Sequence, residues 1–231
     1  MFKNNFLGMK LPIILVNFKC YEESVGERAF KLAKTCEFIS LEYGINISIA
    51  PQFVDIKTIV EEIEIPVFSQ HMDPIEFGAC TGHVVPLSLK EAGAIGSIIN
   101  HSERRLDMER VKKCVELTKK YDLISVCCSA SVNESEEIAK FNPNFIAFEC
   151  PELIGTGIPV SQVKPEVITK CLNEIKKINP KINVLCGAGI KKGKDAKKAL
   201  ELGTVGIILS SGVVKAANPE DILVDLAESI T

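Results

Sequence analysis

Short apolar runs alternate along the chain with longer segments in which apolar residues recur every three or four positions. The short runs have the length of β-strands, and the longer segments have the period of amphipathic helices. Most short runs are apolar throughout, which is typical of strands buried on both faces of a parallel sheet. We predict eight strands, at Ile13–Asn17, Asn46–Ala50, Val67–His71, Gly96–Asn100, Leu123–Cys127, Asn144–Glu149, Ile182–Cys186 and Val205–Leu209.

The segment after the first strand has the clearest helical period. Its apolar positions follow steps of four and three: Val25, Ala29, Leu32, Cys36 and Ile39. Ser24 stands before this pattern and Gly44 after it, so we expect them to cap the two ends of the helix. Residues 108–118 and 222–230 repeat the pattern later in the chain.

Eight strands, each followed by a helix, predict a closed (βα)₈ barrel in the α/β class. No composition break divides the chain, so we expect one domain over residues 9–231. Met9 is a second candidate start, and residues 1–8 would then form an N-terminal extension. An open doubly wound sheet would more often carry a Gly-x-Gly-x-x-Gly turn after its first strand. Here that strand runs into Asn17-Phe18-Lys19 without a glycine.

Composition narrows the class of protein further. The chain has 231 residues, 46% of them hydrophobic, and a formal net charge of −3. A net negative charge does not favour binding to nucleic acid, which requires a basic surface. No apolar run is long enough to span a bilayer, and residues 1–8 lack the apolar core of a signal peptide. We therefore expect a soluble, cytoplasmic protein that binds neither nucleic acid nor membrane.

The nine cysteines raise the alternatives of a metal site or a disulfide framework. The count is odd, no Cys-x-x-Cys pair occurs, and no two histidines stand three to five residues apart. Several cysteines lie inside apolar runs, as Cys127, Cys128 and Cys186 do. We expect reduced cysteines that serve as small core residues, and no metal.

Polar residues gather where the predicted strands end, and in such barrels the active site lies at the C-terminal ends of the strands. The groups are Asn17 and Lys19, Asn100–Arg105, Glu149, Cys186–Gly189 and Ser210–Gly212. Each alone has an ordinary structural explanation: a solvated lysine, a polar cap, a surface acid or a tight turn. Together they bring a base, a cation, an imidazole and two small-residue loops to one mouth. Phosphate sites form at the last two loops of this fold.

Three motifs in this order resemble those of the triosephosphate isomerase family. Asn17-Phe18-Lys19 is similar to its Asn-aromatic-Lys, and His101–Arg105 matches its His-Ser-Glu-Arg-Arg. Glu149–Gly157 resembles its catalytic glutamate followed by a mobile loop ending in Ile-Gly-Thr-Gly. The resemblance covers essentially the whole chain.

The resemblance implies an aldose–ketose isomerase that moves a proton between two carbons of a phosphorylated triose. Glu149 takes the place of the base and His101 that of the electrophile, while Asn17 and Lys19 contact the substrate. We expect Lys19 to be catalytic as well, because its positive charge stabilises the oxyanion as it develops. The family is itself the standard example of a glutamate base beside a neutral imidazole at a helix N-terminus. We accordingly expect His101 at the start of a helix. The reaction needs no metal or cofactor.

Phosphate is implied to bind the backbone at five positions: Ile154, Gly155, Gly189, Ser210 and Ser211. The chain departs from the family pattern at Cys150, where proline is usual, and at Glu152-Leu153, a segment that commonly holds tryptophan. Ser210-Ser211 replaces a Gly-Gly pair. Because the phosphate contacts are largely backbone N–H groups, we expect these changes to be tolerated.

Residues Met72–His83 form the longest break after a predicted strand, punctuated by Pro74, Gly78 and Gly82. This composition predicts a protruding loop that would leave apolar side chains in water. The family's matching loop inserts into a neighbouring subunit, with a threonine where Thr81 stands. The chain is also short, as in the archaeal-type branch, which forms tetramers. The resemblance thus implies a homo-oligomer, with a tetramer favoured over a dimer.

Two other functions are compatible with the barrel. Another phosphate-binding barrel, such as a thiamine-phosphate or tryptophan-pathway enzyme, would share the last two loops but not Lys19, His101 and Glu149 together. A non-catalytic barrel acting as an oligomeric scaffold would not need any of these three residues.

Overall fold

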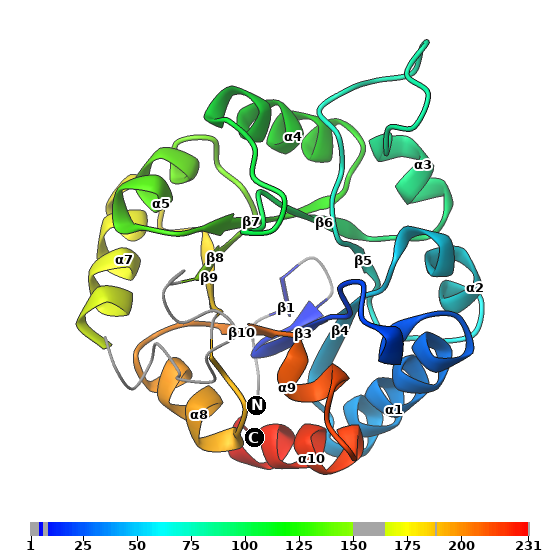
Figure 1. Cartoon of the computed structure of the whole chain (residues 1–231). Helices are drawn as coiled ribbons and strands as arrows, with labels where there is room; N and C mark the ends of the chain where they lie inside the picture. Colours follow the sequence, from blue (N-terminus) through cyan, green and yellow to red (C-terminus); the bar gives the residue numbers. More distant parts are fainter. Residues whose placement is uncertain (1–4, 7–8, 150–164, 188, 231) are drawn as a thin grey trace.

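A computed structural model describes residues 5–6, 9–149, 165–187 and 189–230 of the chain. Eight parallel strands form a central barrel, with helices around its outside (Figure 1). The strands are β3 (Ile13–Asn17), β4 (Asn46–Ala50), β5 (Phe68–Ser69), β6 (Gly96–Ile99), β7 (Ile124–Ser129), β8 (Phe145–Phe148), β9 (Asn183–Cys186) and β10 (Gly206–Leu209). Each coincides with a predicted strand to within two residues at either end, although β5 is only two residues long.

The strands are ordered β4-β3-β10-β9-β8-β7-β6-β5, and every neighbouring pair among them is parallel. A parallel bridge between Ile49 and Val67 joins the two ends of this order. The N–H of Ile49 also donates to the carbonyl of Pro66 at 3.0 Å. The predicted closed (βα)₈ barrel is therefore confirmed.

Each strand except β5 contributes apolar residues to two separate cores. Ile13 and Leu15 of β3 face the cluster inside the barrel, whereas Ile14 and Val16 face the cluster beneath the helices. Successive side chains of a strand point to opposite faces, so a strand buried on both faces is mostly apolar. β4 also buries two polar residues, Asn46 and Ser48, and the Ser48 hydroxyl donates to the Asn46 side-chain oxygen at 3.0 Å.

Helices cover the outside of the barrel (Figure 1). They are α1 (Glu27–Tyr43), α2 (Ile56–Val60), α3 (Pro86–Glu91), α4 (Met108–Lys120), α5 (Val132–Ala139), α7 (Pro165–Ile178), α8 (Gly193–Glu201), α9 (Ser211–Val214) and α10 (Pro219–Ile230), with 3₁₀ turns at Glu22–Ser24 and Phe53–Asp55. The predicted apolar face of α1 is buried from Ala29 to Ile39. Gly44 ends the helix as predicted, in the left-handed conformation at φ 64°.

The predicted N-terminal cap of α1 is wrong. Ser24 lies in the preceding 3₁₀ turn, where its buried hydroxyl donates to the carbonyl of Phe18 at 2.8 Å. That hydroxyl stabilises the loop after β3 rather than the helix. Gly26, at φ 55°, turns the chain into α1 instead, and Val25 is left 42% exposed before the helix begins. Helical spacing at Val25 was therefore misleading.

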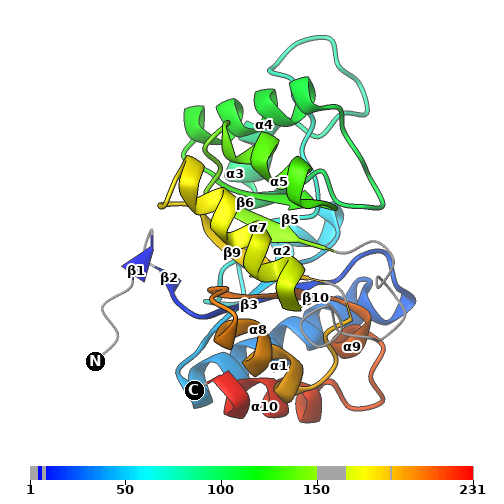
Figure 2. The ribbon, with the colours of Figure 1, turned by 90° about the vertical axis from the view of Figure 1, so that its left-hand side faces the viewer.

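Two further short strands form an antiparallel hairpin, β1 (Asn5–Phe6) with β2 (Met9–Lys10). The hairpin and α9 lie at opposite ends of the barrel (Figure 2). Met9 is buried against the inner core, and the carbonyl of Lys10 accepts a hydrogen bond from the Asn46 amide at 3.1 Å. The chain is thus already tied to the barrel at Met9.

The chain between β5 and α3 contains no helix or strand, as predicted, and it projects beyond the ring of helices (Figure 1). Asp73 and Val84 join its two ends. The N–H of Asp73 donates to the carbonyl of Val84 at 2.9 Å, and the N–H of Val84 donates to the Asp73 carboxylate at 2.7 Å. Glu76 pairs with Lys120 at the end of α4. Phe77, in contrast, is 64% exposed.

Most of the described cysteines are buried and none of them forms a disulfide. Burial raises the pKa of the Cys186 thiol to about 12, so this thiol is unreactive at neutral pH. Cys20 and Cys80 differ from the prediction, because Cys20 is exposed and Cys80 is only partly buried. Among the described helices, none is long and apolar enough to cross a membrane.

Candidate active site

The loops after β3, β6, β8, β9 and β10 carry the predicted site residues to the same end of the barrel. Parallel strands place all of their carboxyl ends at one rim, so these residues meet although they are far apart in sequence. The structure describes Asn17, Lys19, His101, Glu149, Gly189, Ser210 and Ser211. Ile154 and Gly155 lie outside the described residues.

Asn17 ends β3 and shapes the turn that follows. Its side-chain oxygen accepts the N–H of Lys19 at 3.0 Å. Lys19 has a positive φ of 50°, a conformation that costs a non-glycine residue about 1 to 3 kcal/mol. The amide of Gln70 holds this backbone by donating to the Lys19 carbonyl at 2.8 Å. The turn keeps the Lys19 side chain largely buried at the barrel mouth.

The Lys19 ammonium lies 2.7 Å from Oε1 of Glu103. Glu103 is exposed, whereas the Lys19 side chain is only 14% exposed, so the pair joins the loop after β3 to the loop after β6. Glu103 belongs to the predicted His-Ser-Glu-Arg-Arg motif, but no sequence pattern indicated that it pairs with Lys19.

His101 does not stand at a helix start, and this expectation is wrong. The first helix after β6 is α4, which begins at Met108 with Asp107 as its cap. His101 lies instead in a turn where its carbonyl accepts the N–H of Arg104 at 2.8 Å. Its Nδ1 lies 3.2 Å from the backbone nitrogen of Glu103. A peptide N–H can only donate, so Nδ1 is the acceptor and Nε2 carries the proton of a neutral ring.

A network that the sequence did not predict fixes the turn before His101. Asn100 has a positive φ of 62°, and its amide donates to the Cys128 carbonyl and to the Glu134 carboxylate at 3.0 Å each. Glu134 also binds Arg105 and accepts the N–H of Ala130 at 2.7 Å. Buried side-chain networks of this kind hold one loop conformation. The sequence alone could not show that the Asn100 amide binds the Glu134 carboxylate, because the two residues are far apart in the chain.

Glu149 directly follows β8, and its N–H donates to the carbonyl of Ser129 at 2.9 Å. Its side chain is 10% exposed, and Oε2 is buried without a hydrogen-bond partner among the described residues. Burial raises the pKa of Glu149, and the positive charge of nearby Lys19 offsets part of this effect. A carboxylate with a raised pKa and a free oxygen is suited to accept a proton.

Gly187, the first residue after β9, packs directly against Glu149. A Cβ atom at Gly187 would lie 2.6 Å from Cγ and 3.0 Å from Oε1 of Glu149. Its backbone donates to the carbonyl of Phe148 at 2.9 Å. Gly187 belonged to a predicted small-residue loop, but its contact with the glutamate was not predicted. A glycine immediately after a buried strand was the available signal.

The loops after β9 and β10 lie against each other. Gly189 has a positive φ of 76°, and a Cβ at Gly212 would lie 3.1 Å from the carbonyl oxygen of Ile190. Ser210 precedes the short helix α9, and its hydroxyl is buried without a partner among the described residues. Backbone N–H groups at such a turn favour an anion.

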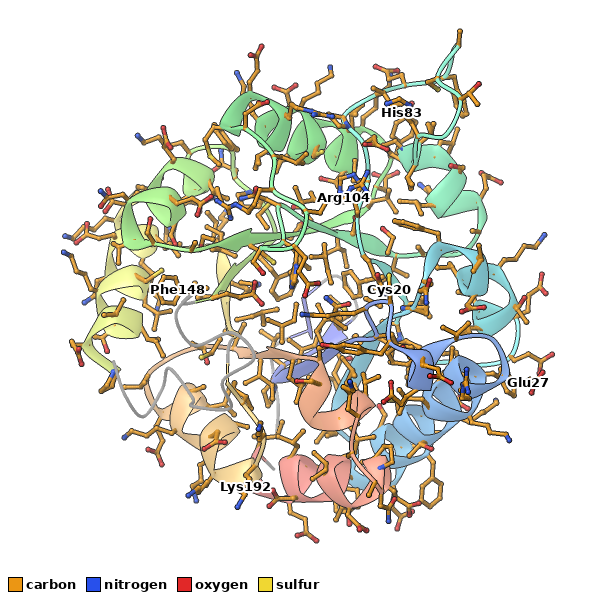
Figure 3. The ribbon with its side chains drawn as sticks, viewed as in Figure 1. Cys20, Glu27, His83, Arg104, Phe148 and Lys192 are labelled. Carbon is orange, nitrogen blue, oxygen red and sulfur yellow. The ribbon has the colours of Figure 1, made fainter. Side chains whose placement is uncertain are left out.

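A cavity of about 230 Å³ opens beside Lys19 and His101. Its walls are Asn17, Lys19, Cys20, Phe53, Gln70, His71, His101, Glu103 and Arg104. Cys20 and Arg104 are labelled in Figure 3. Glu149 does not contribute to this lining, so the cavity adjoins the site away from the carboxylate. No group of three histidine, cysteine or acidic side chains suited to a metal occurs within the described ranges.

Comparisons with known proteins agree on one family. A sequence profile described as triosephosphate isomerase matches residues 12–229. The chain is 49% identical over 218 residues to the triosephosphate isomerase of Methanothermus fervidus, covering 94% of this chain and 98% of that protein. It is 46% identical over 219 residues to the Methanobacterium bryantii enzyme, covering 95% and 97%. Against the Methanocaldococcus jannaschii enzyme it is 45% identical over 218 residues, covering 94% and 100%.

Proposed function

The chain belongs to the triosephosphate isomerase family and is an isomerase of dihydroxyacetone phosphate and D-glyceraldehyde 3-phosphate, and we propose that Glu149, His101 and Lys19 carry its reaction. The observation that carries this assignment is the distance of 3.8 Å between the free Oε2 of Glu149 and Nε2 of His101. This distance is too long for a hydrogen bond between the two groups, so each of them is left able to bond to a substrate. The enzyme serves glycolysis and gluconeogenesis.

Glu149 removes a proton from the carbon next to the carbonyl, and an enediolate forms. The same carboxyl group returns the proton to the neighbouring carbon, so one base serves both half-reactions and the atoms balance without a co-reactant. Burial of Glu149 supports this role, because a raised pKa brings a carboxylate closer to the basicity that proton abstraction needs. No metal or cofactor is required by this chemistry.

His101 and Lys19 stabilise the negative charge that develops on oxygen. The neutral His101 ring, with Nδ1 occupied by the Glu103 N–H, presents its Nε2 proton to the substrate carbonyl. Lys19 contributes its positive charge, held at the site by Glu103. Asn17 contacts the substrate and maintains the Lys19 turn. The substrate phosphate binds the backbone N–H groups at Gly189, Ser210 and Ser211, together with Ile154 and Gly155 outside the described residues.

Turnover of D-glyceraldehyde 3-phosphate by three variants tests these roles. Glu149→Asp should keep the fold and lose about 10²-fold in kcat, because withdrawal by one methylene misplaces the carboxylate by roughly 1 Å. His101→Gln should lower kcat with little change in inhibition by inorganic phosphate. Lys19→Ala should weaken both that inhibition and kcat/KM.

Glu116→Asp on the exposed face of α4 is the matched control and should retain full activity. Near-normal turnover by Glu149→Asp would remove Glu149 as the base. If His101→Gln weakened inhibition by phosphate and Lys19→Ala lowered kcat alone, the roles assigned to His101 and Lys19 would have to be exchanged.

We further propose that the enzyme is a homo-oligomer, with a tetramer favoured over a dimer, in which Met72–His83 docks beside a neighbour's site. Two observations support this contact. Phe77 and Thr81 are exposed on the projecting loop, and the cavity beside Lys19 and His101 has an outer wall of partly exposed Phe53. Burial of Phe77 in another subunit would remove a large apolar side chain from water.

Replacing residues 74–82 with a short Gly/Ser turn tests the contact, because it leaves Asp73 and Val84 in place. The expected product is a monomer by light scattering with sharply reduced activity. An oligomer of unchanged mass, or a fully active monomer, would exclude this loop as the contact. We place the enzyme in the cytoplasm, since its many unpaired cysteines suit a reducing compartment.

A further inference from the structure

The start of α8 carries three lysines in addition to the acidic residue that the first turns of the other long helices also have. Acidic residues occupy the first turn and lysines the last turn of α4 and α7, as the helix dipole favours. In α8, Asp195 and Lys198 follow this pattern as well, but Lys191 and Lys192 precede the helix and Lys194 lies in its first turn. All three side chains are exposed at the end of a helix where a cation is disfavoured. Helix stability therefore does not explain them.

The acidic residues near this helix end are turned toward its backbone. Asp195 is buried, and its carboxylate accepts the N–H groups of Lys191 and Lys192 at 3.2 Å each. Asp225 of α10 accepts the N–H of Gly193 at 2.7 Å. These contacts fix the backbone from Lys191 to Gly193. The side chains of Lys191, Lys192 and Lys194 remain on the surface, and Lys192 is labelled in Figure 3.

The same backbone borders the loops assigned to the phosphate. A Cβ atom at Gly212 would lie 3.4 Å from Cα and 3.6 Å from Cγ of Lys191. Gly212 directly follows Ser210 and Ser211, and Lys191 comes two residues after Gly189. The lysines thus stand at the outer edge of both loops.

We propose that Lys191, Lys192 and Lys194 form a cationic surface that attracts the phosphate dianion of the substrate toward the loops after β9 and β10. This inference rests on the phosphate site proposed above. A phosphomonoester carries a charge of about −1.5 to −2 at neutral pH, while the whole protein has a net charge of −3 and repels it on average. Local positive charge raises the concentration of an anion at a site and its rate of association.

Steady-state kinetics of the substitution Lys191→Gln/Lys192→Gln/Lys194→Gln test the proposal at two ionic strengths. Near 10 mM, where the Debye length is about 30 Å, kcat/KM for D-glyceraldehyde 3-phosphate should fall by about threefold to tenfold. Near 1 M, where the Debye length is about 3 Å, kcat/KM of the variant should approach that of the wild type. The value of kcat should not change, because attraction acts before the bound complex forms.

The substitution Lys176→Gln/Lys177→Gln/Lys181→Gln is the matched control, with the same loss of three charges. Lys176 and Lys177 lie in the last turn of α7 and Lys181 lies between α7 and β9, so all three are at the opposite rim of the barrel. This control should keep at least half of the wild-type kcat/KM at low salt. Turnover of D-glyceraldehyde, which lacks the phosphate, should be equal in both variants and the wild type.

An equal loss in the two lysine variants, a loss that salt does not reduce, or no loss at all would overturn the cationic surface. The phosphate site itself has a separate test in the wild type. If the wild type favours the phosphorylated substrate and the Lys191→Gln/Lys192→Gln/Lys194→Gln variant is unaffected, only the cationic surface is overturned. A wild type that turns over D-glyceraldehyde equally well overturns the phosphate site, and the cationic surface with it.

Discussion

Nε2 of His101 and Oε2 of Glu149 lie 3.8 Å apart at the ends of two strands that are not neighbours in the barrel. His101 is turned by a backbone hydrogen bond to its other nitrogen, and Glu149 is held by burial. Neither group satisfies the other, so an acceptor and a donor face the same space. Such an arrangement costs stability in the free protein and gains its partners when a substrate enters.

Glu149→Gln should therefore abolish most activity while stabilising the fold at neutral pH. Removal of a general base costs about 10²- to 10⁴-fold in kcat. Because burial raises the folded-state pKa of Glu149 above 4.5, the wild type loses stability as pH rises from about 4.5 through that raised pKa. The neutral amide does not titrate, so its melting temperature should exceed that of the wild type at pH 7.

Melting curves at pH 4 and pH 7 separate this effect from a general change in packing. The difference between Glu149→Gln and the wild type should be larger at pH 7 than at pH 4. A difference that is the same at both values would show that ionisation of Glu149 does not limit stability.

Gly187→Ala should reduce kcat by up to about 10²-fold with little loss of stability. The new Cβ would lie 2.6 Å from Cγ of Glu149 and displace its carboxylate, and a displacement near 1 Å is worth roughly that factor. The φ of Gly187 is not in the left-handed region, so alanine fits the backbone. Stopped assays and thermal melts measure the two quantities, and a kcat within twofold of wild type would contradict the predicted displacement.

Glu134→Ala should destabilise the protein by about 2 to 3 kcal/mol and lower kcat, although Glu134 touches no substrate. It leaves the Asn100 amide, the Arg105 guanidinium and the Ala130 N–H without their shared acceptor, beside the turn that orients His101. Glu137→Ala, on the exposed side of the same helix, is the control. Urea unfolding and activity should change in Glu134→Ala alone; equal effects in the two variants would point to helix propensity instead.

His71→Gln should remove part of the acid sensitivity of the fold. Burial lowers the pKa of His71, and Arg104 and Arg110 add to this, whereas Asp73 opposes it from 3.2 Å. The neutral ring therefore contributes stability above pH 6.5 that is lost as pH falls toward the lowered pKa, by at most about 1.4 kcal/mol per pH unit.

Urea unfolding of His71→Gln between pH 5 and 7.5, at one protein concentration, measures this slope. This pH range lies above the titration of Asp73. Burial alone would raise the pKa of Asp73, but the hydrogen bonds from Val84 and His71 outweigh it and lower that pKa. A slope identical to that of the wild type would exclude His71 as the titrating group.

The sequence by itself determined the eight strands and the order of the site residues along them. Strands buried on both faces are mostly apolar, and a motif such as His101–Arg105 is contiguous, so both can be recognised from the sequence. It also determined that Glu149 and His101 would share a rim, because parallel strands end together.

Only the tertiary structure decided how those residues are held. The Lys19–Glu103 pair spans 84 positions, and the contact of Gly187 with Glu149 joins separate strands. The neutral state of His101 follows from one backbone N–H, not from the helix start that we expected. Hydrogen bonds and close packing require that segments distant in sequence be positioned to within a few tenths of an ångström of one another. No local pattern in the chain specifies that placement.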